Sequence, residues 1–340
     1  MARGRKSERR FGAGKALAAL RGLWQGVDVE RRKAAAGTCL KIFAWAAALA
    51  GVGVGLAVAQ NYVLADPARS PVAVHLRLRE LPVWMPDSIA VDIVRSSLPA
   101  GADLNDWDLT RKVHDAVAAS PWVRKIVRVE KRVTDDPGLG VVEVFAEYHR
   151  PAARVPLREG GFAYVSEDAF RLPNEVPRYA ARVAGRNGRA DDIAYFLCEA
   201  DAPAGAACVP VHYMIIDGVE RDAPKVGRRW EGDDLVAGLK LVGVLRDRAY
   251  ARQVKKVDVR NHAWRLSRND TQISIIAHED GGRETVIFFG HFADPEGDWV
   301  ASAERRLANL DLFVANHGGA LAGQAENINI QGWRLRWKPY

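Results

Sequence analysis

The side chains that could do chemistry are scattered along this chain. A His-Glu-Asp run occupies residues 278–280, and imidazole and carboxylate groups can together ligate a metal ion. However, the run falls in a predicted hairpin turn, and turns normally carry solvated polar side chains. We therefore expect a solvated turn there rather than a metal site.

Two pairs of carboxylates have the right chemistry for general acid/base work. Asp191 and Asp192 lie in a loop-like stretch, and Asp233 and Asp234 lie at the start of a predicted helix. Aspartate is common at helix starts because its side chain accepts hydrogen bonds from free backbone N–H groups. Capping and solvation therefore explain both pairs better than catalysis.

His291 and Asp294, which follow a predicted strand, are the best remaining candidates for an active site. The sequence has no HExxH, GxSxG, P-loop or CxxC motif. The Gly-containing run 185–189 lacks the strand-then-helix context of a phosphate-binding loop. We therefore expect a protein that is not an enzyme, with no catalytic residue, no cofactor, no bound metal and no small-molecule substrate.

Cysteine is rare, with Cys39, Cys198 and Cys208 as its three occurrences. Nine residues separate Cys198 from Cys208, and they are mostly Ala, Pro and Gly. In an oxidising compartment such a pair can form a disulfide. We predict this bridge, with two free buried thiols as the alternative.

The net charge of +7 is a property of one segment. Residues 1–41 carry eleven basic and three acidic side chains, and the remaining chain carries 38 basic and 39 acidic ones. The basic excess is therefore a tail, and it gives no reason to expect nucleic-acid binding by the folded part.

An apolar segment follows the basic tail. From Ile42 to Ala65 there are 24 residues without a charge, which as a helix can cross a hydrocarbon core of about 30 Å. Trp45 and Tyr62 lie near its two ends, as interfacial aromatics do. We predict a cytoplasmic tail (1–40), a transmembrane helix (41–65) and an extracytoplasmic remainder, following the positive-inside rule. A signal peptide cleaved near "AVAQ" (57–60) is the alternative, but the apolar and basic stretches are long for one.

Residues 70–150 show the order strand, helix, helix, strand, strand. Apolar and polar residues alternate in 72–79, 120–132 and 141–149, whereas 86–99 and 104–120 have helical spacing. We expect Asn105 or Asp106 to cap the second helix, and Val127 and Val129 to face the core.

Residues 151–340 predict a mainly antiparallel β domain with two helices. The expected strands are a hairpin at 161–173, then 253–259, 262–267, 271–278, 284–290 and one or two edge strands in 326–340. The expected helices are 233–248 and 294–316, the second starting at Asp294 and Pro295 and ending at Gly318. Residues 178–210 are interpreted as an irregular insertion. The fold class is therefore α+β.

Several stretches resemble the FtsQ/DivIB cell-division family. "SPWVRKIVRVEKR" (120–132) is similar to the Trp-Val segment of its second POTRA strand, and "YVSEDAFRLP" (164–173) is similar to its hairpin. "INI" (328–330) stands where the family often has an apolar-Asp-apolar strand. The pattern I-x-V-x-E-x-x-P-x-A is carried here by Val142, Val144, Glu147, Pro151 and Ala152.

The resemblance covers residues 40 to 340, with departures. The usual Gly after the first POTRA strand is absent, Phe170 replaces a small residue, and Asn329 replaces the acidic one. It implies a βααββ POTRA-type module at 70–150 and a β domain at 151–340. It also implies a single-pass inner-membrane scaffold at the division site, whose partners are other membrane-anchored division proteins.

A protein that recruits other chains without catalysis can do so by strand addition to an exposed sheet edge. We expect the last strand region to be this docking edge, with Ile328, Asn329, Ile330, Trp333, Leu335 and Trp337 as candidate contacts. The alternative is that the two Trp residues only pack the β domain. Other functional readings are a POTRA-bearing secretion component, which predicts tandem modules or a membrane barrel, and a membrane-anchored envelope enzyme.

Overall fold

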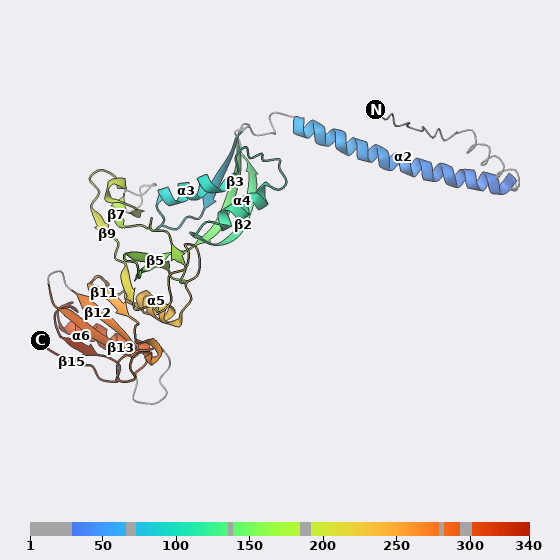
Figure 1. Ribbon diagram of the computed structural model, residues 1–340. Helices are drawn as coiled ribbons and strands as arrows, with labels where there is room; N and C mark the ends of the chain where they lie inside the picture. The colour runs from blue at the N-terminus through green and yellow to red at the C-terminus, as the bar shows by residue number, and fades with distance from the viewer. Residues whose placement is uncertain (1–28, 66–72, 135–138, 184–191, 279–281, 293–300) are drawn as a thin grey trace, which may run out of the picture. The chain divides into compact units, whose positions relative to one another are not determined.

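The computed structural model describes residues 29–65, 73–134, 139–183, 192–278, 282–292 and 301–340. The chain divides into two compact units, Met1–Ser70 and Pro71–Tyr340. The first unit contains a long helix, and the second combines helices with three β-sheets (Figure 1). The predicted α+β class is confirmed.

Helix α2 (Val29–Ala65) dominates the first unit. Within it, Ala36–Gln60 is 25 residues long and apolar enough to cross a membrane, and none of these residues is buried by protein. An apolar helix surface of this size is unfavourable in water. The segment therefore has the length and composition of a membrane anchor, and it starts a few residues before the predicted span.

The second unit begins with what we call the three-stranded module, residues 73–148. Its elements are β1 (Ala73–Arg79), α3 (Asp87–Ser97), α4 (Leu109–Ala118), β2 (Val123–Val133) and β3 (Leu139–Tyr148). The strand order is β1-β3-β2, with β1 parallel and β2 antiparallel to the central β3. These elements occur in the order that the sequence predicts.

Hydrophobic periodicity explains how this module packs. The core-facing side chains are those that alternate on the strands or recur at helical spacing: Val74, Leu76, Leu78, Ile89, Ile93, Leu109, Val113, Val117, Val142 and Val144. Helix α4 begins later than predicted. Its N-cap is Asp108, and the carboxylate of Asp106 instead accepts a hydrogen bond from the Asp108 N–H at 2.9 Å.

The prediction that Val127 of β2 faces the core is wrong. Val127 is 59% exposed, whereas Val129 is half-buried. The register pairs Ile126 with Ala146 and Arg128 with Phe145, so Val127 is an extra residue in a β-bulge. The bulge shifts the alternation and turns Val127 to solvent.

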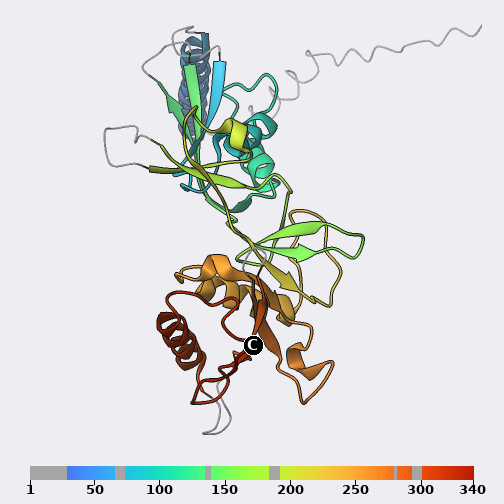
Figure 2. The ribbon, with the colours of Figure 1, turned by 90° about the vertical axis from the view of Figure 1, so that its left-hand side faces the viewer.

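The larger part of the second unit is built on a nine-stranded sheet, which we call the large sheet. Its order is β15-β14-β13-β12-β11-β10-β4-β5-β6, with α5 (Asp233–Leu245) and α6 (Ala303–Asn316) packed on it; Figure 2 shows α6 beside the C-terminal strands. The strands are β4 (Pro151–Pro156), β5 (Phe162–Ser166), β6 (Arg171–Leu172), β10 (Met214–Asp217), β11 (Val254–Asp258), β12 (Ile273–His278), β13 (Glu284–Gly290), β14 (Asn327–Asn329) and β15 (Arg336–Lys338). Five of the eight pairings are antiparallel and three are parallel.

Both helices present apolar stripes to this sheet. The buried positions include Leu235, Leu239, Val242 and Leu245 on α5, and Leu307, Leu310 and Val314 on α6. Helix α6 begins at Ala303, and the Ser302 hydroxyl caps it by accepting a hydrogen bond from the Arg305 N–H. The predicted start at Asp294 and Pro295 lies outside the described residues. Gly318 follows the helix with φ +67°, as a helix-ending glycine does.

The strand predicted at 262–267 is wrong. Residues His262–Trp264 form a 3-10 turn instead, and both Ala263 and Trp264 have φ +55°. Asn261 organises the loop: its amide oxygen accepts from two backbone N–H groups, and its amide nitrogen donates to three carbonyls. This side-chain network replaces a strand ladder.

The insertion predicted to be irregular at 178–210 also contains strands. β7 (Tyr179–Val183) lies between β8 (Asp192–Phe196) and β9 (Cys208–Pro210) in a small antiparallel sheet. Leu197 and Tyr213, from the same part of the chain, pack against the core of the three-stranded module. The insertion is thus a small folded addition to that core.

Candidate functional site

The predicted docking residues lie at the C-terminal end of the large sheet and fall into three groups by exposure. Ile328 and Ile330 are fully buried in the core that includes the α6 side chains, and β14 lies between β13 and β15. Asn329 and Leu335 are half-buried. Trp333 and Trp337 are 55% and 50% exposed. The predicted docking region therefore spans two strands, of which β14 is internal to the sheet and β15 lies at its edge, and docking there remains a prediction.

The Trp337 side chain packs against the protein on one side and is exposed to solvent on the other. It lies opposite Ile328 in the register, on the sheet face that α6 covers. Its ring meets Phe313 edge-to-face at 5.9 Å and His317 at 6.4 Å. One side of the indole therefore packs on α6, while half of the side chain stays available for contact.

The residues around β15 are strongly basic. Arg334, Arg336 and Lys338 are all exposed, and Lys338 is paired with Glu326 at 2.5 Å. Charged side chains on an edge strand discourage indiscriminate pairing with other strands. A strand that adds here needs side chains that tolerate or match this positive charge.

An open groove of about 1090 Å³ lies on the large sheet, and no residue of β15 lines it. Its walls include Phe288 of β13, Asn329 of β14 and the nearby Gln331. The strained loop after β11 supplies Trp264 and Leu266, both exposed. The groove therefore offers exposed apolar surface away from the edge strand, over β13 and the loop after β11.

Arg306, at the base of the groove, has a structural role. Its side chain is 1% exposed and donates to the carbonyls of Ala301, Phe289 and His291 at 2.7–2.8 Å. Burial lowers the pKa of its guanidinium from the ordinary value. These bonds fasten the end of β13 to α6, and they hold Gly290 in a backbone conformation with φ +96° that favours glycine.

Of the carboxylate pair at the start of α5, Asp234 takes part in an internal ion pair with Arg265. Asp234 is buried and accepts hydrogen bonds from the Glu220 N–H and from Arg265, each at 2.8 Å. Burial alone would raise the pKa of Asp234, but these hydrogen bonds keep it below the ordinary value. Of the other pair, Asp192 opens β8 and Asp191 lies outside the described residues.

The histidine candidates do not converge. His278 Nδ1 lies 3.9 Å from Glu284 Oε1, while Glu279, Asp280 and Asp294 fall outside the described residues. His291 contacts Trp264 edge-to-face at 6.1 Å and lines the groove. Within the described residues, no group of three His, Cys, Asp or Glu side chains could hold a metal ion.

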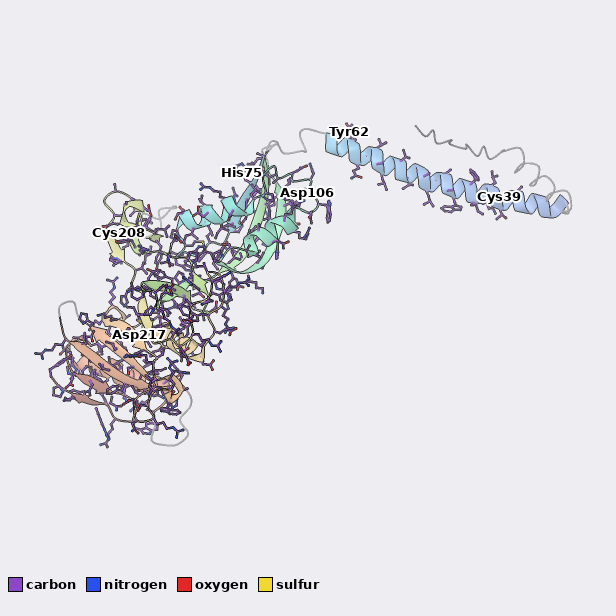
Figure 3. All side chains as sticks on the ribbon, viewed as in Figure 1. Cys39, Tyr62, His75, Asp106, Cys208 and Asp217 are labelled. Atoms are coloured by element: carbon purple, nitrogen blue, oxygen red, sulfur yellow. The ribbon has the colours of Figure 1, made fainter. Side chains whose placement is uncertain are left out.

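Cys198 and Cys208 are both free thiols in the structure, the first exposed and the second half-buried. Cys208 opens β9, whereas Cys198 follows β8, and these strands lie on opposite edges of β7. Strands on opposite sides of a third are about 9.6 Å apart, beyond the usual Cα separation of a disulfide. The structure therefore does not contain the predicted bridge, and it remains a prediction (Figure 3 labels Cys208).

A junction that the sequence did not reveal lies between the three-stranded module and the β5–β6 hairpin. His149, almost fully buried, stacks on Phe170 with ring centres 4.3 Å apart. Its Nδ1 lies 3.6 Å from Asp168 Oδ2, and Arg124 reaches the same carboxylate at 3.2 Å. Burial lowers the pKa of His149 from its ordinary value, against the opposing pull of Asp168. The sequence signal at this junction is Phe170, which stands where the hairpin pattern has a small residue.

Comparison with known proteins gives no further assignment. No family model matches the chain, and no curated protein matches it either.

Proposed function

We propose that this protein is a non-enzymatic, single-span scaffold of the bacterial cell-division machinery. In this proposal α2 crosses the inner membrane with the basic tail in the cytoplasm. Residues 73–340 then lie outside, as a POTRA-type module followed by a β domain. Support comes from the apolar segment Ala36–Gln60, the strand-helix-helix-strand-strand order after it, and the sequence resemblance to the FtsQ/DivIB family.

The observation that carries the proposal is the edge strand β15. It ends the large sheet among the described strands, and its exposed Trp337 lies near the exposed Trp333. Strand addition there would supply main-chain hydrogen bonds, while the indoles would act as anchors. The basic side chains Arg334 and Arg336 favour a partner strand with acidic or polar residues.

In this mechanism the protein performs no reaction. It holds a folded edge beside the membrane, where other membrane-anchored division proteins are already concentrated in two dimensions. Several modest contacts made at once raise the effective concentration of each partner for the others. The scaffold thereby assembles a complex that none of its single contacts would sustain.

The test is the position of an N-terminal fluorescent fusion in growing cells, together with recovery of co-purifying division proteins. We expect the wild-type protein at the division site, and reduced recovery of partners with Trp333→Ala combined with Trp337→Ala. Trp264→Ala is the matched control, because Trp264 is as exposed as Trp337 but lies on the loop after β11. An even distribution around the envelope throughout the cell cycle would contradict the proposal.

A further inference from the structure

Trp107 is the most exposed of the large apolar side chains in the described part of the chain, at 85%. It lies in the loop between α3 and α4, two residues before α4 begins. An exposed Trp costs free energy in water, and its amphipathic ring favours places where one side is apolar and the other wet. The position of this loop in the module indicates which environment of this kind lies within its reach.

The loop lies at the end of the module where β1 begins. Helix α4 leads into β2, and the far end of β2 pairs with the start of β3, as the match of Val133 with Gly140 shows. Lys131, near that end of β2, donates to the backbone carbonyl of Asp106. Figure 3 shows His75 of β1 and Asp106 at the same end of the module.

This end is also the one joined to the apolar helix. Residues 66–72 connect Ala65 of α2 to Ala73 of β1. Eight residue steps span at most about 28 Å even when fully extended. If α2 crosses a membrane, the end of the module that carries Trp107 is therefore confined to the vicinity of that membrane.

The loop holds Trp107 outward on a fixed backbone. Asp106 accepts a hydrogen bond from the Asp108 N–H at 2.9 Å and from Lys112 Nζ at 2.7 Å. Asp108 is paired with Arg111 at 2.7 Å. Hydrogen bonds from Lys112 and Arg111 lower the pKa values of these two carboxyl groups, so both stay ionised and paired. The acidic groups that flank Trp107 are thus neutralised by partners.

We propose that Trp107 inserts into the headgroup region of the bilayer that α2 crosses, so that the three-stranded module rests on the membrane surface. This inference depends on the single-span anchor of the proposed function. An indole at the headgroup level behaves as the interfacial Trp and Tyr residues of membrane proteins do. The contact would fix the direction in which the rest of the second unit leaves the membrane.

The experiment uses the full-length protein in phosphatidylcholine–phosphatidylglycerol vesicles whose acyl chains carry bromine near the headgroups, since bromine quenches nearby indole emission. Trp45, within the apolar helix, reports insertion of α2. We expect Trp107→Phe to reduce the quenched emission by roughly half, because Trp45 is the other indole expected in the bilayer. Trp333→Phe is the matched control and should leave the quenched emission unchanged.

The outcomes separate this inference from the proposed anchor. Quenching from Trp45 that is unchanged by Trp107→Phe would overturn the membrane contact while leaving the anchor intact. The absence of any quenching in the wild-type protein would overturn both. Loss of a co-purifying protein with Trp107→Phe, without a change in quenching, would assign the loop to a protein partner and likewise overturn the inference.

Discussion

The two edge strands of the large sheet, β6 and β15, differ in whether another segment of the chain pairs with them. At β6, the Arg171 N–H donates to the Arg228 carbonyl at 3.0 Å, and the Arg171 carbonyl accepts from the Gly227 N–H at 2.8 Å. Phe170 forms an additional bridge with Arg229. At the other end, β15 is the last strand that the structure describes. One edge is closed by a loop of the chain itself, and the other presents aromatic and basic side chains.

This difference bears on function because an open edge is a hazard that proteins normally cover. The chain has the means to cover an edge, as residues 225–229 do at β6. In the described part of the chain no strand pairs with the outer side of β15, and half of its Trp337 side chain is exposed, which is consistent with an edge reserved for a partner. The following experiments ask whether the two edges differ as this account requires.

The largest expected effect is a loss of stability on truncating a side chain of the core strand β14, compared with a side chain of the edge strand β15. Ile328→Ala should lower the free energy of unfolding by about 3 kcal/mol, because it opens a cavity in the packed core. Denaturant unfolding of the wild type and the variant measures this difference. The neighbouring edge variant Arg336→Ala should change stability by less than about 0.5 kcal/mol; equal losses would contradict the distinction.

The second prediction concerns a substitution in the loop that covers the edge strand β6. Gly227 has φ +79°, and a Cβ there would lie 3.2 Å from Pro121 Cβ. Gly227→Val should therefore cost about 2 kcal/mol of stability, since a β-branched residue is strained in this conformation. It should also promote aggregation by uncovering β6, which sedimentation would detect. A variant that remains as stable and monomeric as the wild type would show that this loop does not protect the edge.

The third prediction concerns the open edge. Replacing Trp333 and Trp337 together with Ala should weaken partner binding by about tenfold or more, as expected when interface anchors are lost. Titration of the recovered partner onto the wild-type and variant proteins measures this change. Since Trp337 also packs on Phe313, a denaturant curve on the same sample serves as the control for folding.

The smallest expected effect is on pH dependence, and it falls on the closed side of the sheet. The pKa of His149 is lowered in the folded protein, so the unfolded chain binds more protons. Stability should therefore fall as pH drops below about 6.5, by less than about 1.4 kcal/mol per pH unit. His149→Phe should flatten the pH dependence of unfolding between pH 7.5 and 5.5. An unchanged slope would mean that other groups set it.

The sequence predicted well those features that depend on local periodicity. The stripes of α5 and α6, and the alternating faces of β1 and β3, occur where apolar spacing indicates them. The failures have other causes. The bulge at Val127 exists only relative to β3, and the loop after β11 is set by hydrogen bonds of the Asn261 side chain, which apolar periodicity does not report.

Local periodicity likewise predicted only part of the candidate site. The C-terminal residues were recognised as strands, but their order in the sheet cannot be obtained from alternation. Ile328 and Ile330 were therefore assigned to an edge although they lie in the core. The groove on the large sheet and the contacts of the buried His149 arise from segments far apart in the chain, and no local pattern indicates them.

The central claim is that β15, and not β6, receives a partner. The most direct measurement places a photoreactive amino acid at Arg336, and in a second strain at Arg228 beside the closed edge, in the full-length protein in growing cells. The account predicts crosslinks from position 336 to a membrane-anchored division protein identified by mass spectrometry, and none to that protein from position 228. Crosslinks from position 228 alone, or the absence of such a partner at position 336, would contradict it.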